Sequence, residues 1–372
     1  MKNTVYIISG PTASGKSLIA YYLAKRIRGE IVNCDSVQLY KYMDIGSAKP
    51  SEKAMAEIQH HLYSIEDPSV NMTVADYRKL AIEAIDDILA RGKTPIVCGG
   101  TGLYLNAILY DMDFGDAPDD EERRRELEEL AAQRGTEYMH EYLQGLDPDA
   151  ASRIHPNNTR KIIRAIEAYE QGKGIKDLSE CEMNTDYDFR FYALTMRREW
   201  LYERINRRVS RLFDQGLVDE VSDLLSRGYT EDLSSMKAIG YKEVIGFLKG
   251  EYDLYDAKEL IMKNTRHFAK RQYTWLKRYD FINWIEIEKG DTVGEIVDRI
   301  LGEDNKTENE CSAIWLRPHT TAGNSDRTTR AISLTISSKR KTIYTWNVKP
   351  YRKSFRIFCV RISLILRAMC SL

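Results

Sequence analysis

The chain has 372 residues, which is more than one compact core usually fills, so we expect two packed units and a tail. Apolar residues make up 43% and charged residues 30%, a balance that excludes collagen-like and wholly disordered chains and predicts a globular protein. The net charge is −1, but 12 of the 55 basic residues and one of the 56 acidic residues lie from Cys311 onward, which leaves −12 before it. A nucleic-acid partner would therefore need a local basic channel, because the body of the protein would repel it.

The ends of the sequence predict neither export nor membrane insertion. The first four residues run directly into an apolar strand pattern, which leaves no room for a signal peptide. The apolar stretch Ile357–Leu372 carries Arg361 and Arg367 and falls short of the roughly 20 apolar residues that a membrane span needs. The six cysteines include no Cys-x-x-Cys pair, so we expect reduced thiols and no zinc site. These features predict a cytoplasmic protein with no membrane contact.

The chain begins with elements of a parallel sheet. Val5–Ser9 is a short, continuously apolar and β-branched run, typical of a strand buried on both faces. A helix is predicted from Lys16 to Arg28, with Gly29 placed to end it, and Glu30–Asp35 is predicted as the second strand.

The same alternation continues to the third strand. Thr73 and Asp76 form a capping-box start for a helix that runs to Gly92, and Thr94–Cys98 is another buried strand. Strands that alternate with helices imply right-handed crossovers, so the predicted fold class is α/β, with a parallel sheet flanked by helices.

Charged, helical sequence follows beyond Asp116, before a strand that returns the chain to the sheet. The predicted helices are Asp119–Arg134, Thr136–Gln144, Asn157–Gln171, Arg198–Gln215 and Tyr255–Tyr279, and the returning strand is Asp188–Met196. The chain is thereby expected to divide into a first part of the α/β core at 1–115, an inserted helical subdomain at 116–187, core completion with C-terminal helices at 188–304, and a basic tail at 305–372.

A phosphate-binding loop lies between the first strand and the first helix. Its sequence fits the pattern Gly-x4-Gly-Lys-Ser/Thr. Glycines let the backbone curl so that its amides and the helix N-terminus face an anion, Lys16 adds a charge, and the Ser17 hydroxyl can hold Mg²⁺. The loop indicates diphosphate or triphosphate binding and nothing more specific. The residues expected to bind the phosphates are Gly10, Pro11, Thr12, Ala13, Ser14, Gly15, Lys16 and Ser17.

Two further loops follow the second and third strands, at the edge of the sheet where α/β ligand sites form. Asp35 ends the second strand, where it is either a functional carboxylate or simply a helix cap. The run Gly99-Gly100-Thr101-Gly102 after the third strand lacks the acidic residue that an ordinary NTPase would use for Mg²⁺ or water. Its glycines suggest close approach of the backbone to a ligand, although a tight turn would explain them as well.

Basic residues recur at helical spacing in two later segments. Arg204 and Arg208 are four residues apart and share a helix face, which is either functional or merely solvated. Residues 266–278 interleave basic side chains with Tyr273 and Trp275, a composition that suits phosphate contact and base stacking. The alternative is a plain amphipathic helix with Trp275 in the core.

These motifs together resemble the tRNA dimethylallyltransferases (tRNA isopentenyltransferases) of bacterial type. The resemblance rests on the phosphate loop, on Asp-Ser-Val-Gln-Leu-Tyr from Asp35, and on Gly-Gly-Thr-Gly-Leu-Tyr from Gly99. It also rests on Ile-His-Pro-Asn-Asn from Ile154, on Ile-Gly-Tyr from Ile239, and on Lys-Arg-Gln-Tyr-Thr-Trp from Lys270. It spans residues from about 5 to about 302 and implies a phosphate-loop NTPase-like fold.

The resemblance implies an activity, partners and site residues. The loop would hold the diphosphate of dimethylallyl diphosphate, and the acceptor would be N6 of adenine 37 in the anticodon stem-loop of tRNA. Asp35 would accept the N6 proton and the arginine pair would embrace the diphosphate. Apart from the resemblance, we expect Mg²⁺ as the cofactor, because the Ser17 hydroxyl can hold it, and a monomeric protein. The implied catalytic residues are Asp35, Lys16, Ser17, Thr101, Arg204 and Arg208. The residues implied to touch tRNA are Asp35, Ser36, Val37, Gln38, Thr101, Arg123, Arg160, Lys161, Arg164, Lys237, Gly240, Tyr241, Lys242, Lys270, Arg271, Gln272, Trp275 and Lys277.

The residue types suit this chemistry on physical grounds. An adenine amine is a poor nucleophile because its lone pair is delocalised into the ring, so a carboxylate within hydrogen-bond reach of N6 lowers the barrier. Charge that grows on a leaving diphosphate is stabilised by backbone amides, a lysine, guanidinium groups and Mg²⁺. The target base must leave its stack, which costs a few kcal/mol and is cheapest in single-stranded RNA.

Three other functions stay open on the sequence alone. A small-molecule or nucleotide kinase could use the same loop and a strand-end aspartate, although no acid follows the third strand. An enzyme that prenylates free AMP or ATP would share the donor, although the inserted helices and the basic run Lys270–Arg278 favour a macromolecular acceptor. The third is a non-catalytic RNA-binding protein regulated by nucleotides.

The tail after about Asn305 departs from the family pattern. Cys311 and His319 lack the paired Cys and His of the zinc-finger extension found on eukaryotic relatives. The tail shows no clear helical or strand periodicity, so we expect a non-native or disordered segment, and the alternative is a genuine RNA-binding extension.

Overall fold

The computed structural model describes residues 3–112, 121–172, 181–303, 332–337 and 343–348. Two compact units divide the chain, Met1–Asn309 and Glu310–Leu372. The first contains a sheet with the order β3-β2-β4-β1-β5-β6, in which all neighbouring strands are parallel. The strands are β1 Thr4–Ser9, β2 Gly29–Cys34, β3 His60–His61, β4 Thr94–Gly99, β5 Asp188–Thr195 and β6 Asn283–Glu286. The predicted α/β class with a parallel sheet is confirmed.

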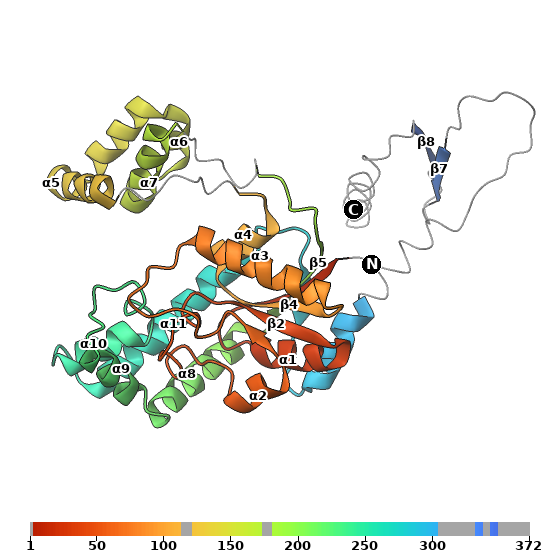
Figure 1. Ribbon diagram of the computed structural model, residues 1–372, viewed down its shortest axis with the longest axis horizontal. Coiled ribbons are helices and arrows are strands. Elements are labelled where there is room, and N and C mark those ends of the chain that lie inside the picture. Colours follow the sequence, from red (N-terminus) through yellow and green to blue (C-terminus); the bar gives the residue numbers. More distant parts are fainter. Residues whose placement is uncertain (1–2, 113–120, 173–180, 304–331, 338–342, 349–372) are drawn as a thin grey trace, which may run out of the picture. The chain divides into compact units, whose positions relative to one another are not determined.

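Helices cover both faces of this sheet. Figure 1 shows α3 and α4 on one face and α1 and α8 on the other, in agreement with the two core clusters. The helices packed around the sheet are α1 Lys16–Ile27, α2 Glu52–Glu57, α3 Val74–Ala90, α4 Gly102–Leu109, α8 Arg198–Asp214, α9 Leu217–Ser226, α10 Tyr241–Leu248 and α11 Leu254–Leu276. A further helical stretch occupies 293–303.

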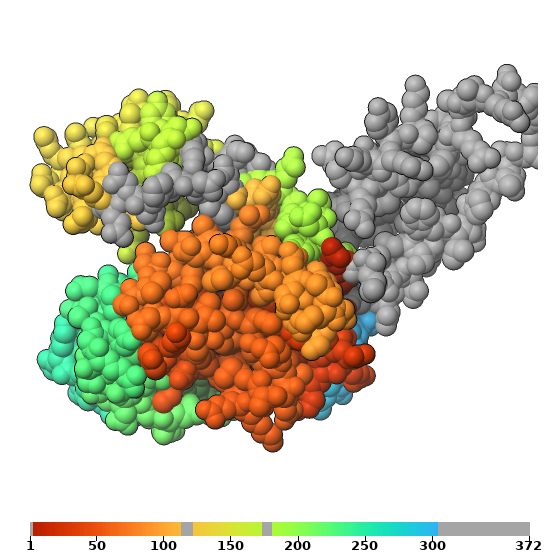
Figure 2. All heavy atoms as spheres, in the orientation of Figure 1, coloured from red at the N-terminus to blue at the C-terminus, as the bar shows by residue number. Residues whose placement is uncertain are grey.

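Strand β1 shows why the sheet is buried on both faces. Tyr6 and Ile8 belong to the core beneath α1 and α8, whereas Val5 and Ile7 belong to the core beneath α3 and α4. Since successive side chains of a strand point to opposite faces, a continuously apolar strand requires two cores. In Figure 2 the segment from α8 to α10, in green, packs directly against the N-terminal segment that ends with α4, in red and orange.

Helices α5 Glu121–Leu146, α6 Pro148–Arg153 and α7 Thr159–Glu170 pack on one another. Leu127, Met139 and Ile162 are fully buried in a core that belongs to these helices. The helix α5 is interrupted at Gly135, where φ is 84° and ψ is 172°, so the prediction of two helices that meet there is confirmed. The proposed boundaries of this subdomain, 116 and 187, stay a prediction.

The capping of two helices tests the sequence predictions in detail. The capping box of Thr73 and Asp76 is present at the start of α3. The end of α1 differs from the prediction, because Arg28, with φ 53°, adopts the left-handed conformation that was assigned to Gly29. Gly29 instead begins β2, where a Cβ atom would lie 2.8 Å from the carbonyl oxygen of Thr94, so close strand packing explains this glycine.

The second unit contains two described strands, β7 Ile332–Ser337 and β8 Ile343–Val348, which pair in antiparallel fashion. This differs from the expectation of a tail without strand periodicity, since Ile-Ser-Leu-Thr-Ile-Ser alternates apolar and polar residues. Cys311 and His319 lie outside the described residues, as does most of the tail. Within the described part of the chain, no helix is long and apolar enough to cross a membrane.

Candidate active site

The phosphate-binding loop lies between β1 and α1, as predicted. Three of its residues have positive φ angles, Gly10 at 143°, Ala13 at 62° and Gly15 at 100°. A Cβ atom on Gly10 would lie 2.9 Å from the carbonyl oxygen of Leu194, so the loop passes tightly beside β5. Gly15 is the N-cap of α1 and supplies no side-chain cap, which leaves the first amides of the helix available to an anion.

Two side chains from distant helices hold this loop in shape. Gln272 of α11 is 5% exposed; its Oε1 accepts a hydrogen bond from the amide of Thr12 at 2.7 Å, and its Nε2 donates to the carbonyl of Gly100 at 3.0 Å. Arg204 of α8 donates from Nε to the carbonyl oxygen of Ala13 at 2.8 Å. The loop is therefore preorganised by the protein itself.

Ser14 places a buried polar atom inside the loop. The residue is 2% exposed, and its Oγ has no hydrogen-bond partner among the residues that the structure describes. A buried hydroxyl without a partner is costly, so the arrangement favours a ligand that can accept its hydrogen bond. A phosphate oxygen in the loop meets that need.

Lys16, Arg208 and Asp35 form a charge cluster next to the loop. Burial lowers the pKa of Lys16, the nearby Asp35 carboxylate acts in the opposite direction, and Arg208 adds to the lowering. Burial likewise lowers the pKa of Arg208, and again Asp35 opposes it. Part of Lys16 still touches solvent. Two cations held together and only partly balanced by one carboxylate make a site suited to a multiply charged anion.

Asp35 is held by turns rather than by a helix. Its Oδ1 accepts a hydrogen bond from the amide of Val37 at 3.0 Å, and its own amide donates to Oδ1 of Asn33 at 3.0 Å. Within the described residues, Oδ2 accepts no hydrogen bond. The residue therefore caps a turn with one oxygen, no α-helix begins there, and the second oxygen is left for a ligand.

Thr101 joins the loops after β2 and β4. Its Oγ1 accepts a hydrogen bond from the amide of Ser36 at 3.1 Å, and its own amide donates to the carbonyl of Cys34 at 3.2 Å. The sequence placed Thr101 in the site, and the structure brings it beside Asp35.

The glycines around Thr101 accommodate protein atoms rather than a ligand. A Cβ atom on Gly99 would lie 2.0 Å from the carbonyl oxygen of Cys34, and one on Gly100 would lie 2.3 Å from Nε2 of Gln272. One on Gly102 would meet the Trp275 indole at 2.4 Å. Packing against α11 and β2 is therefore sufficient to require these glycines, and close approach of the backbone to a ligand stays a prediction.

Of three residues expected to touch tRNA, Tyr241 and Gln272 are buried and Trp275 is half-buried against other parts of the protein. Tyr241 is fully buried, and its hydroxyl donates to Oε1 of Glu220 at 2.8 Å. The indole of Trp275 lies against Gly102 and donates to the hydroxyl of Tyr279 at 3.1 Å. Both ends of the Gln272 amide are occupied, as described above. Side-chain contact of Tyr241 and Gln272 with RNA is excluded unless the core opens, because their polar atoms are already paired inside it.

The basic residues of the predicted tRNA-binding set are mostly exposed. Arg123 is an exception, because its Nε and Nη2 bind the Glu170 carboxylate at 3.0 and 2.7 Å. Lys242 has an acidic neighbour, with its Nζ 3.7 Å from Oε1 of Glu243. The exposed basic residues are Arg160, Lys161, Arg164, Lys237, Lys242, Lys270, Arg271 and Lys277.

A groove of about 350 Å³ lies between the ends of β5 and β6 and the helices α8 and α11. It is lined by basic and aromatic side chains and by no acidic residue, and the rings of Tyr273 and Trp284 stack 6.3 Å apart at 21°. The basic residues are Arg198, Lys270 and Lys277, and the aromatic ones are Tyr202, Tyr273 and Trp284. Sequence reasoning missed Arg198, Tyr202 and Trp284, although the first two share a helix face at four-residue spacing.

The fit of the site to Mg²⁺ depends on Ser17. This residue is exposed at the start of α1, beside the Cys98 thiol. Among the described residues, no group of three or more His, Cys, Asp or Glu side chains could hold a metal ion. Mg²⁺ commonly keeps several waters and binds through substrate phosphates, so a single serine hydroxyl fits an ion that arrives with a diphosphate.

Comparison with known proteins agrees with this geometry. Residues 38–279 match the family model described as IPP transferase. A tRNA dimethylallyltransferase from Alkaliphilus oremlandii is 46% identical over 303 residues, which cover 81% of this chain and 97% of the relative. A full-length tRNA isopentenylpyrophosphate transferase from Bacillus halodurans is 39% identical, with a TM-score of 0.63, over 84% of this chain and 99% of that one. A eukaryotic dimethylallyltransferase acting on tRNA has a TM-score of 0.65 but only 23% identity, which supports the fold alone.

Proposed function

The chain belongs to the IPP transferase family, and from this premise we propose that it transfers a dimethylallyl group from dimethylallyl diphosphate to N6 of adenine 37 in the anticodon loop of tRNA. The products would be N6-isopentenyladenosine and diphosphate. At the level that the relatives establish, the protein is a prenyltransferase that modifies tRNA, on a phosphate-loop NTPase-like fold. Our proposal adds to this the identity of the donor, the position of the modified adenine and the roles of the individual residues.

The observation that carries the proposal is the position of Asp35 beside Lys16 and Arg208. The carboxylate is close enough to both cations to oppose the lowering of their pKa values by burial. An anion held by the cations would therefore lie next to a carboxylate with one unoccupied oxygen. A purine and a prenyl carbon can meet between them.

The acceptor side of the reaction needs a base. The N6 lone pair attacks C1 of the dimethylallyl group, the C1–O bond to diphosphate breaks, and a proton leaves N6. Asp35 accepts that proton through Oδ2, while Oδ1 keeps its bond to the Val37 amide. Thr101 fixes the carboxylate indirectly, by holding the amide of Ser36.

The donor side needs stabilisation of the leaving diphosphate. The amides at the start of α1, the Ser14 hydroxyl, Lys16 and Arg208 supply donors and positive charge to its oxygens. Arg204 belongs beside this set, because it binds the loop carbonyl of Ala13. The loop backbone is held by Gln272 and Arg204 before the substrate arrives, so its amides need little reorganisation during the reaction.

We propose that Mg²⁺ binds beside the diphosphate, at the start of α1. Ser17 would be its one protein ligand, with diphosphate oxygens and water completing the shell. The ion would supply positive charge at the bridging oxygen as the bond to carbon breaks. Lys16 and Arg208 would add positive charge for the same leaving group.

Two basic surfaces of the protein support RNA as the acceptor. The groove between α8 and α11 offers three cations and stacked aromatic rings, the combination that binds single-stranded nucleic acid. The exposed face of α7 adds Arg160, Lys161 and Arg164. The body of the protein is acidic, so these local cations are needed to attract tRNA.

The rival functions are less well supported. A kinase would need an acidic group for metal or water, and the loop after β4 has none. The relatives named above act on tRNA, which disfavours a free nucleotide as acceptor and a purely RNA-binding role. Because every assigned group comes from one chain, we propose that the protein works as a monomer. We also propose that it works in the cytoplasm, as its sequence features predict.

The proposed function is tested by incubating unmodified tRNA with the protein, dimethylallyl diphosphate and Mg²⁺, followed by nucleoside mass spectrometry. One five-carbon group on the adenosine next to the anticodon is expected. Parallel reactions with free AMP and with labelled ATP address the rivals. Addition to AMP but not tRNA, or phosphoryl transfer from ATP alone, would overturn the proposal.

A further inference from the structure

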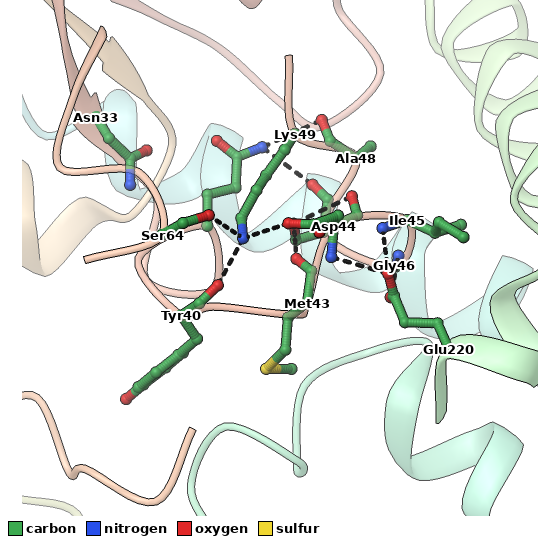
Figure 3. Close-up of polar contacts among 12 residues, drawn as sticks. Asn33, Tyr40, Met43, Asp44, Ile45, Gly46, Ala48, Lys49, Ser64 and Glu220 are labelled. Atoms are coloured by element: carbon green, nitrogen blue, oxygen red, sulfur yellow. Dashed lines mark hydrogen bonds and ion pairs between the residues drawn. The ribbon is translucent and has the colours of Figure 1, made fainter. Parts of the chain in front are cut away.

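The turns that follow Gln38 are anchored by two charged side chains. Residues 39–49 contain no helix and only an isolated bridge of one residue, so this segment resembles the loops that are usually mobile. Figure 3 shows Glu220 and Lys49 directed into it from different sides. The segment directly follows Asp35–Gln38, which carries the proposed base and the expected contacts with the adenine.

Glu220, in the first turn of α9, binds the backbone of the turn at 44–46. Its Oε2 accepts hydrogen bonds from the amides of Asp44 at 2.9 Å and Ile45 at 2.6 Å, and its Oε1 accepts one from the amide of Gly46 at 2.9 Å. The Tyr241 hydroxyl is the fourth donor, at 2.8 Å from Oε1. Charge-assisted bonds of this kind are about twice as strong as neutral ones, so the carboxylate fixes the turn.

Lys49 closes the turn from inside. Its side chain is 4% exposed, and Nζ donates to Oδ1 of Asp44 at 2.7 Å and to Oγ of Ser64 at 2.8 Å. The carbonyl oxygen of Tyr40 accepts its third hydrogen. All three hydrogens of the ammonium group are thereby used, as a buried charge requires.

The anchored turn at residues 44–48 also orients the side chain of Gln38. This residue is 7% exposed, and its Nε2 donates to the carbonyls of Ser47 at 3.0 Å and Ala48 at 3.3 Å. Its Oε1 accepts no hydrogen bond from the residues that the structure describes. An amide oxygen held in this way is suited to accept a hydrogen bond from the N6 amine of an adenine.

We propose that Glu220 is a positioning residue for the transfer reaction, acting through the 44–48 turn on Gln38 and so on the target adenine. The inference rests on the proposed function. It also gives a role to Tyr241, which is buried beneath Gly46 and completes the set of donors to Glu220. Glu220 touches neither substrate, so it acts by geometry alone.

The test is the substitution Glu220→Gln, combined with Gln38→Met in a double-mutant cycle. Glutamine turns an NH₂ group toward backbone amides that are themselves donors, so the turn loosens. At saturating tRNA and donor, kcat should fall about tenfold or more, because small displacements of reacting groups are costly. In the chain that already carries Gln38→Met, Glu220→Gln should lower kcat by less than about twofold.

A matched control and a binding measurement complete the design. Asp219→Asn removes the neighbouring charge from the same turn of α9, and Asp219 is exposed and binds no described residue, so kcat should stay within about twofold. The dissociation constant for tRNA should also change less than about twofold in Glu220→Gln. If that variant is too unstable to assay, Tyr241→Phe, which removes one donor and keeps the ring, replaces it in the cycle.

The outcomes separate this inference from the proposed function. Three results for Glu220→Gln would overturn the positioning role. They are an equal loss of kcat in the chains with Gln38 and with Gln38→Met, a loss confined to tRNA affinity, and no loss at all. If the unsubstituted protein adds no five-carbon group to tRNA, the proposed function is wrong, and the positioning role of Glu220 is wrong with it. A loss of kcat that disappears in the Gln38→Met background supports the inference.

Discussion

Gln272 shows what a single residue's sequence context can and cannot reveal. It lies in a basic, aromatic run, which suggested contact with RNA. Its spacing from Ala269 and Leu276, both buried in the structure, is the spacing of one helix face, and this signal could have placed it in the core. Its partners at Thr12 and Gly100 lie 260 and 172 residues away, and no local pattern encodes them.

The substitution Gln272→Met tests the role of this residue. Methionine keeps the volume but removes both hydrogen bonds, which leaves the Thr12 amide unpaired and should cost about 1–3 kcal/mol of unfolding free energy. We expect the KM for dimethylallyl diphosphate to rise about tenfold, with little change in tRNA affinity, because the loop loses its shape. Urea unfolding and steady-state kinetics measure both. An unchanged KM for the donor together with weakened tRNA binding would contradict this role and indicate that Gln272 contacts RNA.

The positions of Asp35 after β2 and of Lys16 at the start of α1 were predicted because strand ends and the phosphate-loop pattern carry their own geometry, whereas the roles of both residues stay a prediction. The alternative of a helix cap at Asp35 was resolved only by the structure, which shows turns instead. The pairing of Tyr241 with Glu220 was missed, since it joins two segments that are both short helices without a strong signal.

At the scale of elements, α11 has one face packed against the protein and one exposed basic face. Gln272, Trp275 and Leu276 face the protein, whereas Lys270, Arg271 and Lys277 are exposed. The sequence predicted the helix within about three residues at each end. It could not decide between core and RNA for Trp275, and the alternative of a place in the packing is the one the structure supports.

The exposed face of α11 gives a salt-dependence prediction. Replacing Lys270 or Lys277 by alanine should weaken tRNA binding and reduce the slope of log K against log salt by about 0.7 for each phosphate that the lysine no longer neutralises. Lys263→Ala is the control, because it removes an exposed lysine of the same helix that does not line the groove. Filter binding over a range of salt concentrations measures the slope. A slope unchanged in both groove variants would exclude these lysines from the interface.

Glu30 in β2 gives a prediction for the stability of the protein and for how that stability depends on pH. Its side chain is 2% exposed and binds Arg91, Lys93 and His61, with Arg91 contributing both Nη1 and Nη2 at 2.6 and 2.7 Å. These hydrogen bonds, those of Arg91 foremost, hold the pKa of Glu30 well below its ordinary value of 4.5 against the effect of burial. Glu30→Gln should therefore cost about 3 kcal/mol of stability at neutral pH.

The sign of the pH effect follows from that depressed pKa. The contribution of Glu30 is fully present above the ordinary value of 4.5 and is lost as the pH falls through the lower folded-state value. Urea unfolding from pH 7 to pH 3 should show the two proteins converging in acid. Glu57→Gln, which breaks an exposed ion pair with Lys25, serves as the comparison. A difference that stays constant over this range would contradict the assignment.

For the whole molecule, the sequence predicted the class of fold better than its arrangement. Strong periodicity revealed β1, β2, β4, β5 and the longer helices. The two-residue β3 and the four-residue β6 carry too little pattern to be seen, because tertiary pairing with β2 and β5 defines them. Consequently the groove beside β6 and the anchoring helices α9 and α10 emerged only from the structure.

The tail can be tested by truncation after Gly302. All residues assigned to the site and the groove lie between Gly10 and Trp284, and the match to the Alkaliphilus relative covers 303 residues. The shortened protein should keep tRNA affinity and turnover within about twofold of the full chain. A large fall in affinity with a smaller salt slope would show that the basic tail binds RNA.

The central claim is that Asp35 works as the base beside a preformed diphosphate site. Asp35→Asn keeps an oxygen for the Val37 amide but cannot accept a proton, so it tests the chemistry without loosening the turn. Single-turnover transfer at saturating tRNA and donor should slow about 100-fold or more while the dissociation constant for tRNA is largely kept. A transfer rate equal to that of the unsubstituted protein, or a loss explained wholly by weaker tRNA binding, would contradict the account.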